Sequence, residues 1–308
     1  MTTAGRGEYL SSNAFVYLKL MGTAFFWGGT FVAGRMVAQQ MGPYSASFMR
    51  FAAASLMLLA VVWRVENKLP RPGANDLLPL ILMGMTGVFA YNICFFKGLQ
   101  TIAAGRAALI VANNPVVIAF FSAILFKERL TVYRGAGIAL SITGAMVVIS
   151  GGNPVAALSG GVGAGELWIL GCVASWATYS LIGKTAVAHL SPLVSVCYSS
   201  IVGTAALAVP AFNEGLLGLA GDFGLVEWGG LMYLSLFGTV MALTWYIDGI
   251  KRIGPTKASV FINFVPVSAV VLSFLILREP LTASLVLGLV LVSSGVYLTN
   301  ARLMTESG

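Results

Sequence analysis

The side chains best suited to bind a ligand are aromatic and polar residues inside long apolar runs. Trp27 and Trp176 stand 149 positions apart, and each is followed by further aromatic or hydroxyl groups at helical spacing. The two sets are Trp27, Thr30 and Phe31, and Trp176, Tyr179 and Ser180. We expect each set to face a shared binding site, with tight aromatic packing inside a helix bundle as the alternative.

A second pair of clusters lies further along each half of the chain. Tyr91, Asn92 and Phe95 combine rings with an amide, and Thr244, Trp245 and Tyr246 stand at nearly equivalent positions. Aromatic rings can stack on an apolar ligand, while amides and hydroxyls orient its polar groups. We expect these six residues to line the same site.

Amides and prolines occur together in two apolar runs. Asn113 and Asn114 precede Pro115, and Asn263 lies three residues before Pro266. A proline inside a helix removes a backbone hydrogen bond and favours a kink, whereas a buried amide without a partner costs about 2–7 kcal/mol. The asparagines therefore either satisfy the interrupted backbone or bind ligand. Each proline is either a hinge at the site or a packed kink.

Charged groups are almost absent from the apolar runs. Arg50 is the exception, and it is a candidate for structural pairing or for gating. The middle of every run lacks Asp and Glu, which argues against a proton-coupled carrier of cationic compounds. A cluster of basic residues for phosphate groups is also missing.

These residues must be positioned by membrane helices. The chain is 58% apolar and 9% charged, against about 45–50% and about 25% in soluble domains. Ten apolar runs are long enough to cross a bilayer. They are residues 15–38, 44–63, 76–97, 105–126, 134–151, 165–186, 192–212, 228–248, 256–277 and 283–300.

The chain is an internal duplication. Residues 80–149 repeat as 231–300 without a gap, through pairs such as Gly87/Gly238 and Pro115/Pro266. The basic connection 64–76 corresponds to the acidic connection 213–227, as expected when five helices per half invert the second repeat. The distribution of Lys and Arg then places both termini in the cytoplasm. We predict an all-α membrane protein of ten helices in two inverted five-helix repeats, 15–150 and 165–300, joined by a linker at 151–164.

Two long segments carry a family resemblance. They read AALIVANNPVVIAFFSAILFKERLT and ASVFINFVPVSAVVLSFLILREPLT, each followed by a glycine-containing helix. With these motifs the chain resembles the ten-helix EamA-type exporters of the drug/metabolite transporter superfamily. Its acid-free, aromatic first helices are also similar to the aromatic amino acid exporter branch. The resemblance implies a multi-pass protein of the bacterial inner (plasma) membrane.

Several repeated residues have structural interpretations. Thr131 and Thr282 can cap the helices that follow them, and Glu128 and Glu279 can bind backbone amides or a nearby cation. Repeated glycines allow helices to approach closely in a membrane. They are Gly137, Gly144, Gly288 and Gly295. We expect the fifth and tenth helices that carry them to lie outside the solute pathway.

An aromatic site with neutral donors suits a small, net-neutral solute. We expect export of aromatic or large neutral amino acids by alternating access, each half rocking against the other, facilitated rather than proton-coupled. The alternatives are proton-coupled export of another small neutral metabolite or drug, an intramembrane enzyme, and a receptor or channel. We expect a small-molecule substrate and membrane lipid as partners. We expect no enzymatic activity, cofactor, metal ion or nucleic acid, and a monomer would suffice.

Overall fold

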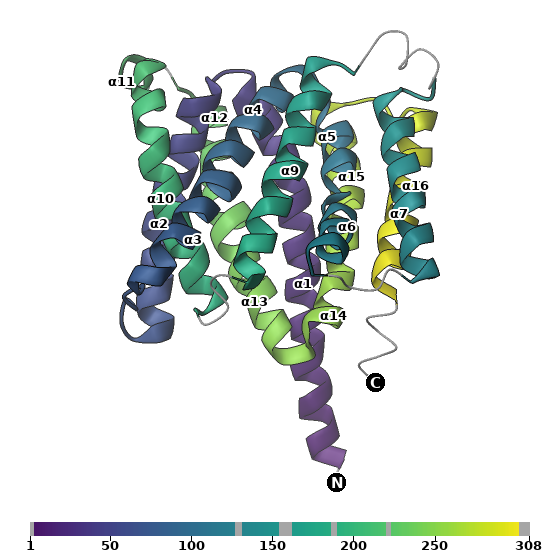
Figure 1. Ribbon diagram of the computed structural model, residues 1–308, viewed down its shortest axis with the longest axis horizontal. Coiled ribbons are helices and arrows are strands. Elements are labelled where there is room, and N and C mark those ends of the chain that lie inside the picture. Colours follow the sequence, from purple (N-terminus) through teal and green to yellow (C-terminus); the bar gives the residue numbers. More distant parts are fainter. Residues whose placement is uncertain (1–2, 127–130, 154–161, 186–189, 220–222, 302–308) are drawn as a thin grey trace.

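The computed structural model describes residues 3–126, 131–153, 162–185, 190–219 and 223–301, and these residues are almost entirely helical (Figure 1). The first repeat contains α1 (Thr3–Ala38), α2 (Pro43–Glu66), α3 (Ala74–Met83), η1 (Gly84–Ala90), α4 (Tyr91–Thr101), α5 (Ala104–Val111), α6 (Asn114–Phe126) and α7 (Val132–Ile149). The second contains α9 (Ala164–Thr185), α10 (Pro192–Asn213), α11 (Leu216–Leu219), α12 (Leu225–Met232), η2 (Tyr233–Met241), α13 (Ala242–Ile253), α14 (Pro255–Val260), η3 (Phe261–Asn263), α15 (Phe264–Leu277) and α16 (Ala283–Ala301).

The ten predicted helical runs are all present, so the all-α membrane fold is confirmed. Eight helical stretches among the described residues are long and apolar enough to span a membrane. The shorter α16 and the less apolar α9 complete the bundle. The chain is a multi-pass membrane protein.

The second repeat is inverted relative to the first. α1 begins and α16 ends at the same end of the bundle, and α1 runs away from that end whereas α9 runs back toward it (Figure 1). The equivalent helices α2 and α10 pack together, and Ser55 of α2 and Thr204 of α10 have their hydroxyls 3.2 Å apart. Because these two residues occupy matching repeat positions, the pseudo-two-fold axis passes between them.

The first helix of each repeat packs mainly against the other repeat. α1 contacts α15, α13 and η2, whereas α9 contacts α4, α5, α6 and η1. Rocking of one sequence repeat as a rigid body against the other would break these contacts. Any rigid unit that preserves them must combine helices from both repeats.

The repeated glycines join α7 to α16 at one edge of the bundle (Figure 1). A Cβ added at Gly295 would lie 2.5 Å from the backbone nitrogen of Ser141 and 2.7 Å from the carbonyl oxygen of Gly137. A Cβ at Gly144 would lie 2.8 Å from the backbone nitrogen of Val292. These two backbones therefore approach as the sequence predicted, and this helix pair stands apart from the centre.

Two kinds of irregularity interrupt the central helices. The fourth and ninth spans break just before their prolines, between α5 and α6 at Pro115 and through the 3₁₀ turn η3 before Pro266. The predicted kinks are thus helix breaks. The third and eighth spans carry π-helical segments, η1 and η2, in matching parts of the two repeats. Such segments inside membrane helices frequently mark functional sites.

Side chains close the helix ends. Thr131 accepts a hydrogen bond from the Arg134 amide at 3.4 Å, and Thr282 accepts one from the Leu285 amide at 3.2 Å, so both predicted caps are confirmed. Glu279 accepts from the amides of Ala104 and Gly105 at 2.8 and 3.1 Å, which is the structural role predicted for it. Glu128 lies outside the described residues.

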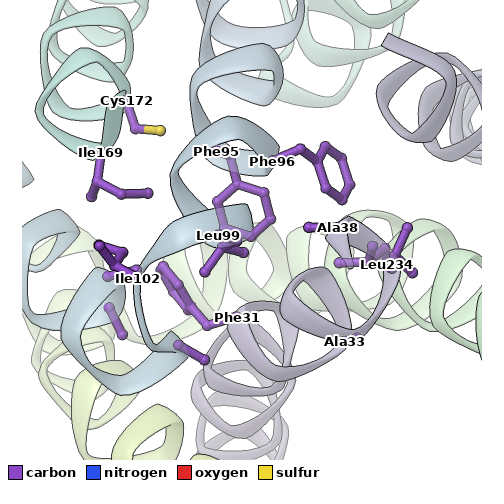
Figure 2. Packing of buried hydrophobic residues seen from close by; sticks show 14 of the residues in the cluster. Phe31, Ala33, Ala38, Phe95, Phe96, Leu99, Ile102, Ile169, Cys172 and Leu234 are labelled. Carbon is purple, nitrogen blue, oxygen red and sulfur yellow. The ribbon is translucent and has the colours of Figure 1, made fainter. Parts of the chain in front are cut away.

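A buried apolar cluster holds α1, α4, α9 and η2 together (Figure 2). Phe31 of α1, Phe95 and Leu99 of α4, and Ile169 of α9 meet there, with Leu234 of η2 close by. The cluster therefore joins helices of both repeats.

Candidate functional site

One aromatic cluster lies where α1, α4 and α9 meet. Tyr91 packs against Phe95 with ring centroids 6.0 Å apart and against Trp176 with centroids 5.6 Å apart. Trp176 stacks on Tyr179 at 5.2 Å, and Phe31 meets Phe95 edge-on at 5.5 Å. The structure thus brings together five residues that the sequence singled out. Trp176 remains 37% exposed.

A second aromatic cluster joins α1 to η2 and α13. Trp27 packs on Tyr246 with centroids 5.3 Å apart, and Phe26 packs on Trp245 at 5.5 Å. Phe26 also contacts Tyr233 and Phe237 of η2. The predicted residues Trp27, Trp245 and Tyr246 therefore lie together, but in a different cluster from Trp176.

Both clusters touch the π-helical segments through matching glycines. Gly87 of η1 lies under the ring of Tyr179, and Gly238 of η2 lies under the methyl group of Thr30. Gly238 also accepts a hydrogen bond from Trp27 Nε1 at 3.0 Å through its carbonyl oxygen. Thr30 of α1 and Tyr179 of α9 occupy equivalent positions in the two repeats. The first helix of each repeat therefore packs on the π-helical segment of the other repeat.

The predicted hydroxyl groups mostly bond within their own helices. Thr30 Oγ1 donates to the carbonyl of Trp27 at 2.6 Å, Ser180 Oγ to that of Trp176 at 2.8 Å, and Thr244 Oγ1 to that of Val240 at 2.8 Å. Each of these hydroxyls already uses its proton. They retain only acceptor capacity for a solute.

The asparagines next to the prolines divide into two roles. Asn113 donates to the carbonyls of Leu109 and Ile110 at 3.0 and 3.2 Å and accepts from Ser141 Oγ at 2.7 Å. It satisfies the interrupted backbone, the first of its two predicted alternatives. The buried side-chain oxygens of Asn114 and Asn263 lack a hydrogen-bond partner among the described residues. Such buried, unsatisfied acceptors are rare in proteins, and they could accept from a solute.

Arg50 of α2 joins α4 to the π-helical segment η2. Its Nη1 donates to Asn92 Oδ1 at 3.0 Å, and its Nη2 donates to Thr239 Oγ1 of η2 at 3.4 Å. Asn92 in turn donates to the carbonyl of Val88 in η1 at 2.7 Å, and Ser235 of η2 donates to the Arg50 carbonyl at 2.9 Å. Asn92, predicted to contact solute, is 1% exposed and binds Arg50 instead in this conformation.

The acidic residues that the structure describes gather at helix ends. Glu214 accepts from the amide of Ser45 at 2.6 Å, beside the start of α2, and Glu166 pairs with Arg106 at 2.8 Å. Asp248, near the end of α13, pairs with Lys19 and Arg252, each at 2.9 Å. The aromatic clusters and Arg50 therefore have no carboxylate bonded to them in the described part of the chain.

A cavity of about 380 Å³ opens where α1, α12 and α15 approach one another. It is lined by Arg35, Met36, Gln39, Gln40, Val226, Leu277 and Glu279. Arg35 donates to the carbonyl of Leu99, and Gln39 donates to those of Leu99 and Gln100. We refer to this open pocket, which is lined by both polar and apolar side chains, as the vestibule.

Sequence patterns missed several parts of the site. Four residues of the aromatic clusters and of the Arg50 surroundings were not predicted: Phe26, Tyr233, Ser235 and Thr239. Tyr233 donates a hydrogen bond to the Phe26 carbonyl at 3.1 Å. The repeated pair Gly87/Gly238 was the available signal, because it marks both π-helical segments. The bonds of Arg50 could not be read from the sequence, since its partners are 42 and 189 positions away.

Comparison with known proteins defines the family. The model of the EamA-like transporter family matches residues 14–150 and again 163–301, nearly the whole chain. The chain belongs to the EamA-like transporter family. Two copies of the EamA unit in one chain agree with the inverted repeat seen in the fold. Because the family consists of transporters, the protein is a transporter and not an enzyme.

Full-length relatives are transporters as well. The chain is 28% identical to the uncharacterized transporter YyaM of Bacillus subtilis, over 91% of this chain and 92% of that protein. It is also 28% identical to the uncharacterized inner membrane transporter YedA of Escherichia coli strain K12, over 92% and 94%. A probable terminal-alkyne amino-acid exporter of Streptantibioticus cattleyicolor is 27% identical, over 91% of each chain.

A solved structure described as "Crystal structure of protein" has the same fold. The TM-score is 0.61 at 19% identity, and the match covers 96% of this chain and 98% of that one. At this identity the likeness concerns the fold alone.

Proposed function

We propose that this EamA-family transporter exports aromatic or other large neutral amino acids across the bacterial inner membrane by alternating access. The observation that carries the proposal is the aromatic cluster of Tyr91, Phe95, Trp176 and Tyr179 beside η1. Its rings offer stacking surfaces to an apolar side chain. The amino-acid exporter among the relatives supports the same class of solute.

The solute-contacting residues in this proposal are the two aromatic clusters and the free amide oxygens. Trp176 and Tyr91 would pack on the solute side chain, and the side-chain oxygens of Asn114 and Asn263 would accept hydrogen bonds from the solute. Pro115 and Pro266 would act as hinges, because a helix break stands just before each of them. Asn113, Thr30, Ser180 and Thr244 would shape the site through the backbone bonds they already make.

Facilitated export, rather than proton antiport, fits the placement of the acidic groups. Proton relays in membrane carriers are built from groups such as Asp, Glu and His inside the membrane. Asp248, near the end of α13, is held by Lys19 and Arg252. The proposal therefore assigns the driving force to the gradient of the amino acid itself.

The proposed orientation places both termini in the cytoplasm. The C-terminal end of α2 and its connection to α3 carry Arg64, Lys68 and Arg71, and they lie at the end of the bundle where α1 begins (Figure 1). Glu214 and Glu227 belong to segments at the opposite end. The positive-inside rule then assigns the first end to the cytoplasm.

Counterflow tests this function. Proteoliposomes loaded with unlabelled neutral amino acids, at equal pH on both sides, would be given labelled phenylalanine, methionine or threonine. We expect saturable exchange, strongest for phenylalanine, reduced by Trp176→Ala and by Trp27→Ala. Folded protein that exchanges none of the three amino acids would contradict the proposed substrate class.

A further inference from the structure

We propose that Arg50 binds the carboxylate of the transported solute where the two repeats meet. This inference rests on the proposed function and names the chemical group that the transporter recognises. Three features of Arg50 support it: unused donors, the lack of a counter-ion, and a position next to the aromatic cluster.

The guanidinium of Arg50 has donors to spare. It carries five N–H groups, and two of its nitrogens bond to Asn92 and Thr239. Its Nε lacks a hydrogen-bond partner among the described residues although the side chain is only 8% exposed. An unsatisfied donor at this depth is costly. A carboxylate of the solute would accept from it in the bidentate geometry that arginine favours.

Arg50 also lacks a counter-ion. No carboxylate of the described residues lies within ion-pair distance of it. The rings of Phe51 and Phe95 flank the guanidinium carbon at 5.2 and 5.8 Å, which partly compensates the charge. A cation without a counter-ion inside a membrane is expensive and is typical of a functional site.

The fold itself does not require a charge at this position. The repeat equivalent of Arg50 is Ser199 of α10, whose backbone carbonyl approaches Gly84 of η1 just as the Arg50 carbonyl meets Ser235 of η2. Gly84 and Ser235 are themselves repeat equivalents. The same helix crossing is thus made in one repeat by a serine and in the other by an arginine, so the charge has another purpose.

The position of Arg50 determines which kind of anion can bind to it. Arg50 touches Phe95, and Phe95 packs on Tyr91, which contacts Trp176. A carboxylate at Arg50 would direct an apolar side chain along these rings. One cation suits one carboxylate, so the class of ligand is a monocarboxylate with an apolar or aromatic side chain. Because Arg50 is buried, α2, α4 and η2 must separate to admit the solute.

Competition in the counterflow assay tests the assignment. Unlabelled phenylalanine and phenylalaninamide, which keeps the ring and the ammonium but lacks the carboxylate, would compete with labelled phenylalanine. For the wild type we expect the amide to compete about 10- to 100-fold less well, the usual effect of losing a charge-assisted bond. In Arg50→Gln the two competitors should become equal. Arg64→Gln, an exposed position on the same helix, should keep the wild-type ratio.

Other outcomes would overturn the assignment. Equal competition by the amide in the wild type needs no variant and would show that the carboxylate is not recognised. An unchanged ratio in Arg50→Gln would show that another group recognises it.

A ligand without an ammonium separates this inference from the proposed function. If no amino acid exchanges, thermal stabilisation by 3-phenylpropionate would be measured on the purified protein. Stabilisation of the wild type and Arg64→Gln, but not of Arg50→Gln, would support Arg50 as the carboxylate site while the amino-acid proposal fails. Equal stabilisation of all three proteins, or of none, would reject Arg50.

Discussion

The two repeat-related tryptophans should differ when each is replaced by phenylalanine. Trp27 Nε1 donates to the carbonyl of Gly238 at 3.0 Å, whereas no hydrogen bond joins the Trp176 indole to another residue that the structure describes. Both substitutions keep an aromatic ring at the position. Trp27→Phe should therefore also lose the hydrogen bond to η2. Trp176→Phe loses no such bond and serves as the control.

The size of that difference follows from hydrogen bonds measured inside membranes. Such bonds contribute on average ~0.6 kcal/mol and at most ~1.7 kcal/mol. This range corresponds to a factor of about 3 to about 16 in the unfolding equilibrium, at 1.4 kcal/mol per tenfold. The difference in unfolding free energy between the two variants should lie toward the upper end of this range, because the Gly238 carbonyl lies in a π-helical segment where intrahelical bonding is already irregular.

Unfolding of the purified protein in detergent measures this difference. Wild type, Trp27→Phe and Trp176→Phe would be compared by denaturant titration under identical conditions. We expect Trp27→Phe to be the less stable of the two variants by the stated amount. If Trp176→Phe is equally or more destabilised, the hydrogen bond between Trp27 and Gly238 does not hold α1 to η2.

Two further substitutions test the packing of the bundle and the coupling of transport. Gly295→Ala should destabilise the protein by about 1–3 kcal/mol, because its Cβ would meet the backbone of α7 at 2.5 Å; Gly135→Ala, with open space around it, should not, and equal unfolding midpoints would refute the close approach. Asp248→Asn removes the ion pairs to Lys19 and Arg252, and partly exposed pairs contribute only about 0–1 kcal/mol. Asp248→Asn should therefore exchange amino acids at equal pH as the wild type does, and an imposed pH gradient should not change exchange by either protein. If a pH gradient drives uptake by the wild type and Asp248→Asn abolishes that uptake, the transporter is proton-coupled.

The sequence predicted those parts of the fold that depend on local pattern. Apolar run length gave the ten helices, and the repeated glycines gave the contact between α7 and α16. Thr131 and Thr282 are caps as expected, because a hydroxyl before a helix bonds amides only three residues away. The prolines located the breaks, since each removes a backbone donor.

Features that depend on distant contacts were not predictable in this way. A π-helical segment of seven or nine residues barely alters the hydrophobic period, so η1 and η2 left no signal except the pair Gly87/Gly238. The packing of α1 on the second repeat and of α9 on the first is set by tertiary contacts. For the same reason the hydrogen bond between Arg50 and Asn92 could not be predicted.

We infer that the solute binds with its carboxylate at Arg50 and its side chain against Tyr91 and Trp176. A structure of the protein determined with phenylalanine bound would test this placement. We expect a carboxylate oxygen within hydrogen-bond distance of the Arg50 guanidinium and the phenyl ring against Tyr91 and Trp176. Phenylalanine bound instead only in the vestibule between Arg35 and Glu279, with Arg50 still joined only to Asn92 and Thr239, would contradict it.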